Sequence, residues 1–231
     1  FWQPINTIAN FYNSVLTAVS YLERIFETID EPVAVKDATD AVQMPQIKGD
    51  VAFDHVTFSY EDGIPILHDV SFKVQQGETI AIVGPTGAGK TTIVNLLSRF
   101  YNVDRGTVKI DGIDISKVTL RSLREQMGVM MQDSFIFSGT IMDNIRYGNK
   151  KASDEDVIRA AKTVCAHDFI VQMEDGYNTQ VNERGSRLSV GQRQLISFAR
   201  ALLADPAILI LDEATSSIDT ETEIVLQEGL S

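Results

Sequence analysis

A glycine-rich stretch at residues 84–91 has the residue types and spacing of a loop that binds phosphate. It reads G-x-x-x-x-G-K-[ST], ends at Lys90 and Thr91, and lies between the apolar run Ile80–Val83 and a helix-like run that begins at Ile93. Glycines let successive backbone N–H groups curl around an anion, and a helix N-terminus adds positive potential. Lys90 would reach the terminal phosphates, and the Thr91 hydroxyl would bind Mg²⁺. The sequence therefore predicts a chain that binds a nucleoside triphosphate.

Two carboxylates follow an apolar run near the C-terminus. Ala207–Leu211 favours a strand, and Asp212 and Glu213 come directly after it. Together with the phosphate loop, Asp212 is expected to hold a hydrated Mg²⁺. Glu213 projects differently from its neighbour and would polarise an attacking water; the alternative is a surface carboxylate.

The third candidate is Leu188-Ser189-Val190-Gly191-Gln192, at the start of a helical pattern. A serine and a glycine that open a helix offer an anion a hydroxyl, bare N–H groups and the helix dipole. An ordinary N-terminal cap is the alternative for Ser189.

Short strands and helices would position these groups. Residues 134–180 are expected to be mostly helical, and Ser153 with Asp156 predicts an N-terminal cap. We expect strands at 51–53, 56–58, 70–74, 80–83, 107–110, 129–131 and 207–211, and helices starting at 93 and spanning 120–127, 154–164 and 190–203.

The N-terminal 29 residues predict one amphipathic helix. Its apolar residues alternate by three and four, at Ile5, Ile8, Tyr12, Val15, Val19, Leu22, Phe26 and Ile29. The residues between them are too polar for contact with lipid, which favours packing on the chain's own domain or in a coiled coil. Pro32 ends the helix, and an irregular linker follows.

Size and composition set outer limits. The chain has 231 residues, a formal charge of −12 and one cysteine. The charge argues against broad nucleic-acid binding, and a single cysteine excludes an internal disulfide. No run of 18 apolar residues and no signal peptide is present. Because the sequence starts at Phe1 and stops in a helical pattern at Ser231, we expect a fragment.

The motifs together resemble those of ATP-binding cassette (ABC) proteins. Residues 188–192 resemble the family signature Leu-Ser-Gly-Gly-Gln, with Val190 in place of a glycine. Tyr60, 24 residues before Gly84, resembles the aromatic residue on which adenine stacks; an exposed strand tyrosine is the alternative. Gln132 resembles the Q-loop glutamine, the alternative being a plain loop amide. Residues 216–219 resemble the D-loop.

The resemblance assigns roles residue by residue. It implies ATP contacts for Tyr60, Gly84, Pro85, Thr86, Gly87, Ala88, Gly89, Lys90, Thr91, Thr92, Asp212, Ser189, Gly191 and Gln192. It implies Mg²⁺ contacts for Thr91, Gln132 and Asp212, and catalytic roles for Glu213 and Gln132.

Within the family, the sequence resembles an exporter half. Asn182–Gly185 resembles the X-loop of ABC exporters. The implied fold class is α/β: a P-loop NTPase core with an antiparallel β subdomain and a helical subdomain, preceded by a long N-terminal helix. The implied domains are 1–30 as the cytoplasmic end of the last transmembrane helix, 31–48 as a linker, and 49–231 as a nucleotide-binding domain truncated at its C-terminal end, with its helical subdomain at about 134–190. Phe135–Ser138 would seat a coupling helix or be ordinary core.

The function implied by the resemblance is ATP binding and hydrolysis that drive export. The partners would be a second ABC subunit, in a head-to-tail dimer, and the chain's own membrane domain with its coupling helices. Val190 in the signature favours a heterodimer. No nucleic acid is expected as a partner. The protein would lie in the cell membrane with this domain on the cytoplasmic side. His55, His68 and His167 do not match the family's switch histidine, so slow or absent turnover is expected. The alternatives are a cytosolic ABC ATPase acting on nucleic acid or the ribosome, and a non-catalytic ATP-binding regulator.

Overall fold

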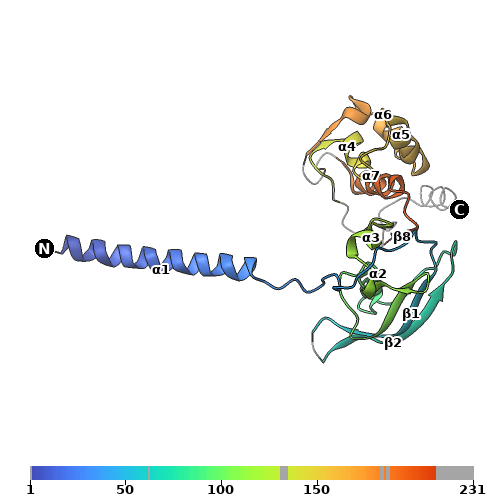
Figure 1. Ribbon diagram of the computed structural model, residues 1–231. Helices are drawn as coiled ribbons and strands as arrows, with labels where there is room; N and C mark the ends of the chain where they lie inside the picture. Colours follow the sequence, from blue (N-terminus) through green and yellow to red (C-terminus); the bar gives the residue numbers. More distant parts are fainter. Residues whose placement is uncertain (1, 62, 131–134, 183–184, 186–187, 212–231) are drawn as a thin grey trace. The chain divides into compact units, whose positions relative to one another are not determined.

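The computed structural model describes residues 2–61, 63–130, 135–182, 185 and 188–211. Contacts divide the chain into two units, Phe1–Lys36 and Asp37–Ser231. The first unit holds one long helix. The second holds a sheet with two short helices and a separate group of helices, as Figure 1 shows.

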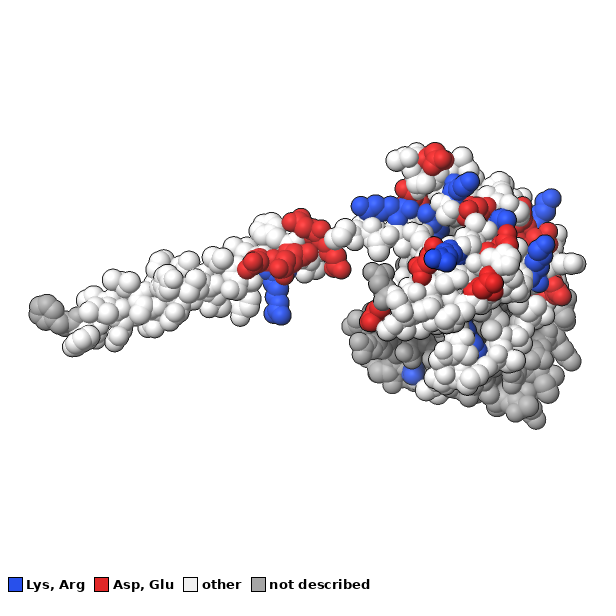
Figure 2. Space-filling model, turned by 90° about the horizontal axis from the view of Figure 1, so that it is seen from below, with Lys and Arg blue, Asp and Glu red and all other residues white. Residues whose placement is uncertain are grey.

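The first unit confirms the predicted N-terminal helix as α1, Gln3–Ile29. Threonine hydroxyls at positions 7, 17 and 28 donate to the carbonyl four residues earlier, so these polar groups are satisfied within the helix. The predicted apolar seam is exposed along its whole length. No charged residue precedes Glu23, and Figure 2 shows carboxylates gathered at the C-terminal end of the helix. None of the described helices is long and apolar enough to cross a membrane.

Four antiparallel strands form the larger sheet, in the order β2-β1-β3-β4. They are β1 (Val51–Ser59), β2 (Pro65–Val74), β3 (Arg105–Ile110) and β4 (Ile113–Asp114). The predicted strands at 51–53 and 56–58 are thus one strand, with a register shift between Phe53 and Val56. His55, which lies in that irregularity, has a left-handed backbone with φ of 51°. A bulge of this kind bends a strand without ending it.

A parallel pair of strands forms a second, smaller sheet. β5 (Met127–Met130) pairs with β8 (Ile208–Leu211), which confirms the predicted strand before Asp212. The short helix α3, Leu120–Arg124, ends before the predicted limit because Met127 already belongs to β5.

The predicted buried strand at residues 80–83 is wrong. No described strand pairs with this segment, and the side chains of Ile82 and Val83 are 39% and 87% exposed. A strand needs a neighbour for its N–H and C=O groups. Among the described residues, β5 pairs only with β8, so no ladder extends to this segment. An apolar run sets a preference for burial, but the pairing partner decides whether a strand forms.

The helical subdomain contains α4 (Ile141–Arg146), α5 (Asp154–Thr163), α6 (His167–Val171) and α7 (Val190–Leu203). A two-stranded pair, β6 (Gly139–Thr140) with β7 (Gln180–Val181), joins it, and two short 3₁₀ helices lie at 115–117 and 176–178.

The predicted capping box is confirmed: Ser153 Oγ accepts from the Asp156 N–H at 3.2 Å and donates to its carboxylate at 2.8 Å. At position 148 an added Cβ would lie 2.0 Å from the Arg200 carbonyl oxygen, so only glycine permits this close approach to α7.

Two hydrophobic cores match the two parts of the second unit. One lies under the antiparallel sheet and the other among α4–α7. Alternate residues of β8 face different cores: Ile208 and Ile210 pack with the first, and Leu209 packs with the second. The parallel pair is therefore the partition between the two cores.

The segment assigned from sequence to a linker is in part docked on the second unit. Met44 and Ile47 are buried in the core under the sheet. Ile47 N donates to Gln126 Oε1 at 2.8 Å, and Gln126 Nε2 donates to the carbonyl of Pro45 at 3.0 Å. The carboxylate of Asp111 accepts from the N–H groups of residues 48, 49 and 50. Residues 44–50 thus pack against the rest of the second unit, to which they belong.

Candidate nucleotide site

The phosphate loop is an irregular turn that leads directly into α2, Lys90–Leu97. Gly87 and Gly89 both have left-handed backbones, with φ of 84° and 86°. A Cβ at position 89 would lie 2.7 Å from Cδ2 of the buried Leu67, so this position needs glycine for space as well as for φ. Within the loop, Ala88 N donates a hydrogen bond to the Pro85 carbonyl at 3.1 Å.

Lys90 folds back over the loop that precedes it. Its Nζ donates to the carbonyls of Gly84 at 2.8 Å and Pro85 at 3.1 Å. The ammonium group is therefore held beside the backbone of the loop that precedes α2. This arrangement places a positive charge and a helix N-terminus together, as an anion site requires.

The two threonines after Lys90 have different surroundings. Thr91 is exposed at the first turn of α2, whereas Thr92 is buried. The Thr92 hydroxyl accepts a hydrogen bond from the Tyr60 hydroxyl at 3.2 Å. Thr92 was expected to contact ATP, and the structure shows that its hydroxyl is directed to Tyr60.

Tyr60 lies at the end of β1 with its ring beside α2. Its hydroxyl also accepts from Asn95 Nδ2 at 3.1 Å. The ring meets Phe58 and Tyr101 edge to face, with centroid distances of 4.9 and 5.0 Å. Tyr60 nevertheless remains 45% exposed, so part of the ring is accessible to a flat ligand. Sequence reasoning missed Asn95, because nothing in a helix pattern shows which strand residue an amide will meet.

The signature segment caps α7. Ser189 Oγ accepts from Gln192 N at 3.2 Å, and Gln192 Oε1 accepts from Ser189 N at 3.0 Å, which forms a capping box. The capping alternative for Ser189 is thus part of the geometry, but its hydroxyl hydrogen is still available to a ligand. Val190 is 52% exposed and Gly191 is half-buried, so both stand at an accessible helix N-terminus.

Several expected site residues lie outside the described part of the chain: Gln132, Asp212, Glu213 and residues 216–219, with Glu183 and Arg184 of the X-loop. The strands that precede two of them are described. β5 ends at Met130 and β8 ends at Leu211, and these two residues pair in register. Both strands therefore end at the same edge of the parallel pair.

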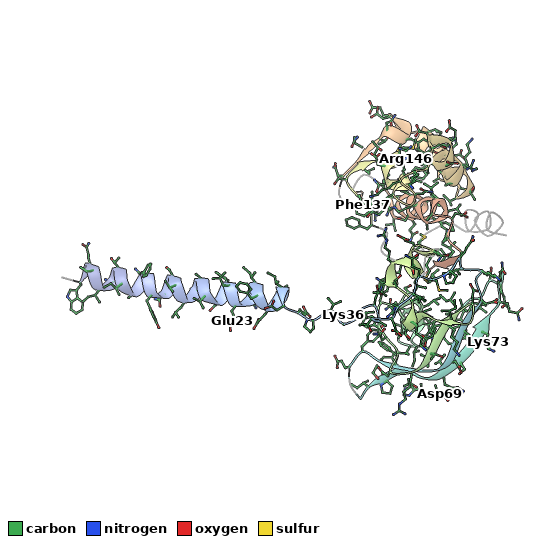
Figure 3. The ribbon with its side chains drawn as sticks, in the orientation of Figure 1. Glu23, Lys36, Asp69, Lys73, Phe137 and Arg146 are labelled. Atoms are coloured by element: carbon green, nitrogen blue, oxygen red, sulfur yellow. The ribbon has the colours of Figure 1, made fainter. Side chains whose placement is uncertain are left out.

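An exposed aromatic surface lies on the helical subdomain, made of Phe135, Phe137 and Tyr147. The Phe137 ring lies 5.0 Å from Phe135 and 4.6 Å from Tyr147, measured between centroids. Ile136 between the two phenylalanines is fully buried. The core alternative therefore holds for Ile136, whereas Phe135 and Phe137 are exposed. Figure 3 shows Phe137 at the edge of this subdomain.

Arg200 of α7 contacts both the backbone and a ring of the aromatic surface. Its guanidinium donates to the carbonyl of Phe135 at 2.9 Å, the carbonyl of Asn144 at 2.8 Å and Asn144 Oδ1 at 3.0 Å. It also lies 5.3 Å from the Phe137 ring centroid. Burial lowers the pKa of Arg200 from its usual range. Sequence reasoning missed Arg200 and Tyr147, since one belongs to α7 and the other follows the end of α4.

Comparison with known proteins places these motifs in one family. The family model described as ABC transporter matches residues 67–216. The Bacillus subtilis protein YknV, named as an uncharacterized ABC transporter ATP-binding protein, is 55% identical over 100% of this chain and 38% of its own length. A fatty acid ABC transporter ATP-binding/permease protein of Mycobacterium tuberculosis is 44% identical, over 100% of this chain and 36% of its own length. The chain thus spans less than half of the curated relatives it matches.

A solved structure agrees in both fold and sequence. It is a bacterial Atm1-family ABC exporter with ATP bound, and its similarity covers 99% of this chain and 40% of that chain. The TM-score is 0.87 and the sequence identity is 41%. This agreement confirms the predicted α/β fold with its antiparallel sheet, helical subdomain and long N-terminal helix. The phosphate loop, the signature segment and the family match together lead to one conclusion: this chain belongs to the ABC transporter family and is an ATP-binding module of that family.

Proposed function

We propose that this chain is the ATP-binding and ATP-hydrolysing module of an ABC exporter. The observation that carries the proposal is the phosphate loop at residues 84–90, in which the Nζ of Lys90, the first residue of α2, lies 2.8 and 3.1 Å from the carbonyl oxygens of Gly84 and Pro85. The similarity to an exporter structure over 99% of the chain supports the same function. The phosphate loop at residues 84–90 would hold the phosphates of ATP, and Tyr60 would support the adenine.

Hydrolysis would need a metal ion and an aligned water. The chemistry of the donor set fits Mg²⁺, since the hydroxyl of Thr91, the carboxylate of Asp212 and the amide oxygen of Gln132 are hard oxygen ligands. Mg²⁺ would neutralise charge on the phosphates, and Glu213 would align the attacking water.

Replacement of Glu213 tests the enzymatic part. In the intact protein, Glu213→Gln should abolish steady-state phosphate release while ATP binding, measured by calorimetry, stays within about twofold, because an amide cannot take a proton. Glu78→Gln, which changes an exposed carboxylate beside Gln75 N, is the matched control. Undiminished hydrolysis by Glu213→Gln would refute the assignment.

The second ABC subunit would complete the site. Ser189, Gly191 and Gln192 lie at an accessible helix N-terminus and would face the ATP held by the phosphate loop of the partner. Val190 adds bulk at this point, which favours a heterodimer whose two sites differ. Purification of two copies of this same protein that carry different tags tests this. A heterodimer holds only one copy of it, so the two tags should not co-purify, whereas recovery of a homodimer alone would contradict the proposal.

The remaining partner would be the membrane domain of the same protein. Residues 1–30 would be the cytoplasmic end of its last transmembrane helix, and residues 31–48 the connection to the nucleotide-binding domain. The absence of charge before Glu23 supports this position for α1. The protein would then lie in the cell membrane with this domain on the cytoplasmic side, and membrane fractionation tests that location.

The aromatic surface of Phe135, Phe137 and Tyr147 would seat a coupling helix. Phe137→Ala should reduce transport-linked stimulation of ATP hydrolysis without changing ATP affinity. The neighbouring Ile136 packs in the core among α4–α7, whereas α2, which follows the phosphate loop, packs in the core under the antiparallel sheet. Val171→Ala, an exposed apolar residue on α6, is the control. Equal stimulation in both variants would contradict the seat.

A further inference from the structure

We infer that Asn95 and Thr92 are positioning residues that orient the Tyr60 ring for the nucleotide base. The inference rests on the proposed function, because it takes Tyr60 as the surface that supports adenine. What it adds is a physical reason for the orientation of that ring, through two residues of α2 that no comparison assigns to it.

The tip of the Tyr60 ring is fixed by two hydrogen bonds to one helix. Tyr60 hydroxyl donates to Thr92 Oγ1 at 3.2 Å and accepts from Asn95 Nδ2 at 3.1 Å. Thr92 and Asn95 are three residues apart, so they lie on the same face of α2. The hydroxyl thus uses both its donor and its acceptor capacity on that face.

The sides of the ring are fixed by neighbouring aromatic rings. Phe58 and Tyr101 each meet it edge to face, with interplanar angles of 86°. Phe58 and Thr92 are buried, whereas Tyr101 is 42% exposed, so packing fixes one of the two neighbouring rings and one of the two hydrogen-bond partners. The ring is held at its tip and at two edges while it remains 45% exposed.

This connection ties the Tyr60 ring and the phosphate loop to the same helix. Lys90 is the first residue of α2, and the two residues that hold Tyr60 come from the same helix. A ligand that contacts both the ring and the loop therefore meets surfaces whose separation is already set. Preorganisation of this kind raises affinity because less motion is lost on binding.

The expected effects separate base binding from phosphate binding. Tyr60→Ala should weaken Mg²⁺-ATP binding to the intact protein by about 5- to 140-fold, the range for loss of a base–aromatic stack. Asn95→Ala should weaken it by about three- to tenfold, the range for one hydrogen bond that orients a group. Neither change should alter the affinity for inorganic tripolyphosphate, which has no base. Asn102→Ala, an exposed asparagine after α2, should change neither affinity.

A double-mutant cycle distinguishes positioning from a general effect on the helix. In the Tyr60→Phe background the hydroxyl is gone, so Asn95→Ala should cause no further loss of ATP affinity. An Asn95→Ala effect that persists in that background, or that is equal for tripolyphosphate, would overturn the inference. Unchanged ATP affinity in Tyr60→Ala would instead refute the adenine platform of the proposed function, which this experiment therefore tests separately.

Discussion

Replacement of Gly89 by alanine should destabilise the protein far more than the same change at Gly87. Both residues lie in the phosphate loop and both have left-handed backbones, with φ of 86° and 84°. They differ in space. A Cβ at position 89 would lie 2.7 Å from Leu67 Cδ2, whereas nothing lies within 4 Å of a Cβ at position 87. The pair therefore separates backbone strain from steric contact.

The magnitudes follow from these two terms. An alanine in the left-handed region costs roughly 1–2 kcal/mol, and this cost is shared by both variants. Leu67 is buried in the core under the antiparallel sheet and has little room to move. Forcing a methyl group against it adds roughly 1–3 kcal/mol. We therefore expect a loss of about 1–2 kcal/mol for Gly87→Ala and about 2–5 kcal/mol for Gly89→Ala.

Urea denaturation, with the free energy of unfolding extrapolated to water, measures the difference. Gly63→Ala is a second control, since this glycine has φ of 86°, open space around it and a place outside the phosphate loop. It should resemble Gly87→Ala in stability. An equal loss for Gly89→Ala and Gly87→Ala would show that Leu67 does not restrict the loop, and the packing described here would then be wrong.

Three further changes test other parts of the structure. Gly148→Ala should disrupt the packing of α4 on α7, because its Cβ would lie 2.0 Å from a backbone oxygen; faster proteolysis of the helical subdomain measures this, and resistance equal to wild type would contradict the contact. Gln126→Ala should cost about 1–3 kcal/mol, since a buried residue, Ile47, loses the partner of its N–H; hydrogen exchange at residues 44–48 should rise, and unchanged exchange would contradict the docked segment. The hydrogen bond to Asp69 raises the pKa of His55 above its ordinary value of 6.5. Stabilisation by this pair is therefore complete below about pH 6.5 and is lost as the pH rises through the raised value, so Asp69→Asn should be less stable than wild type at pH 5.5 and equal to it at pH 8.5. A stability difference that grows with pH would refute this sign.

Local signals in the sequence were sufficient for the elements that they control directly. The capping residues Ser153 and Ser189 sit at the starts of α5 and α7 because an N-terminal cap is satisfied within four residues of chain. The strand before Asp212 formed as predicted. The strand at residues 80–83 did not, although its residues are equally apolar, because strand formation depends on a neighbour that the run itself does not specify.

Contacts between distant residues were outside the reach of sequence patterns. The amide of Asn95 meets a hydroxyl 35 residues earlier in the chain. Arg200 reaches the carbonyl of Phe135 across 65 residues, and the segment before β1 is held by Gln126. Each of these depends on how separate elements pack. Periodicity could predict that Phe135–Phe137 contains core residues, but only packing showed that Ile136 is the one inside.

The most direct test of this account is calorimetric titration of Mg²⁺-ATP into the intact protein and its Lys90→Ala variant. Lys90 holds the positive charge of the phosphate loop, so the variant should show no saturable heat under conditions in which wild type binds. Lys73→Ala, on the exposed side of β2, should bind like wild type. Binding of equal affinity by Lys90→Ala would contradict the claim that the loop at residues 84–90 holds the triphosphate.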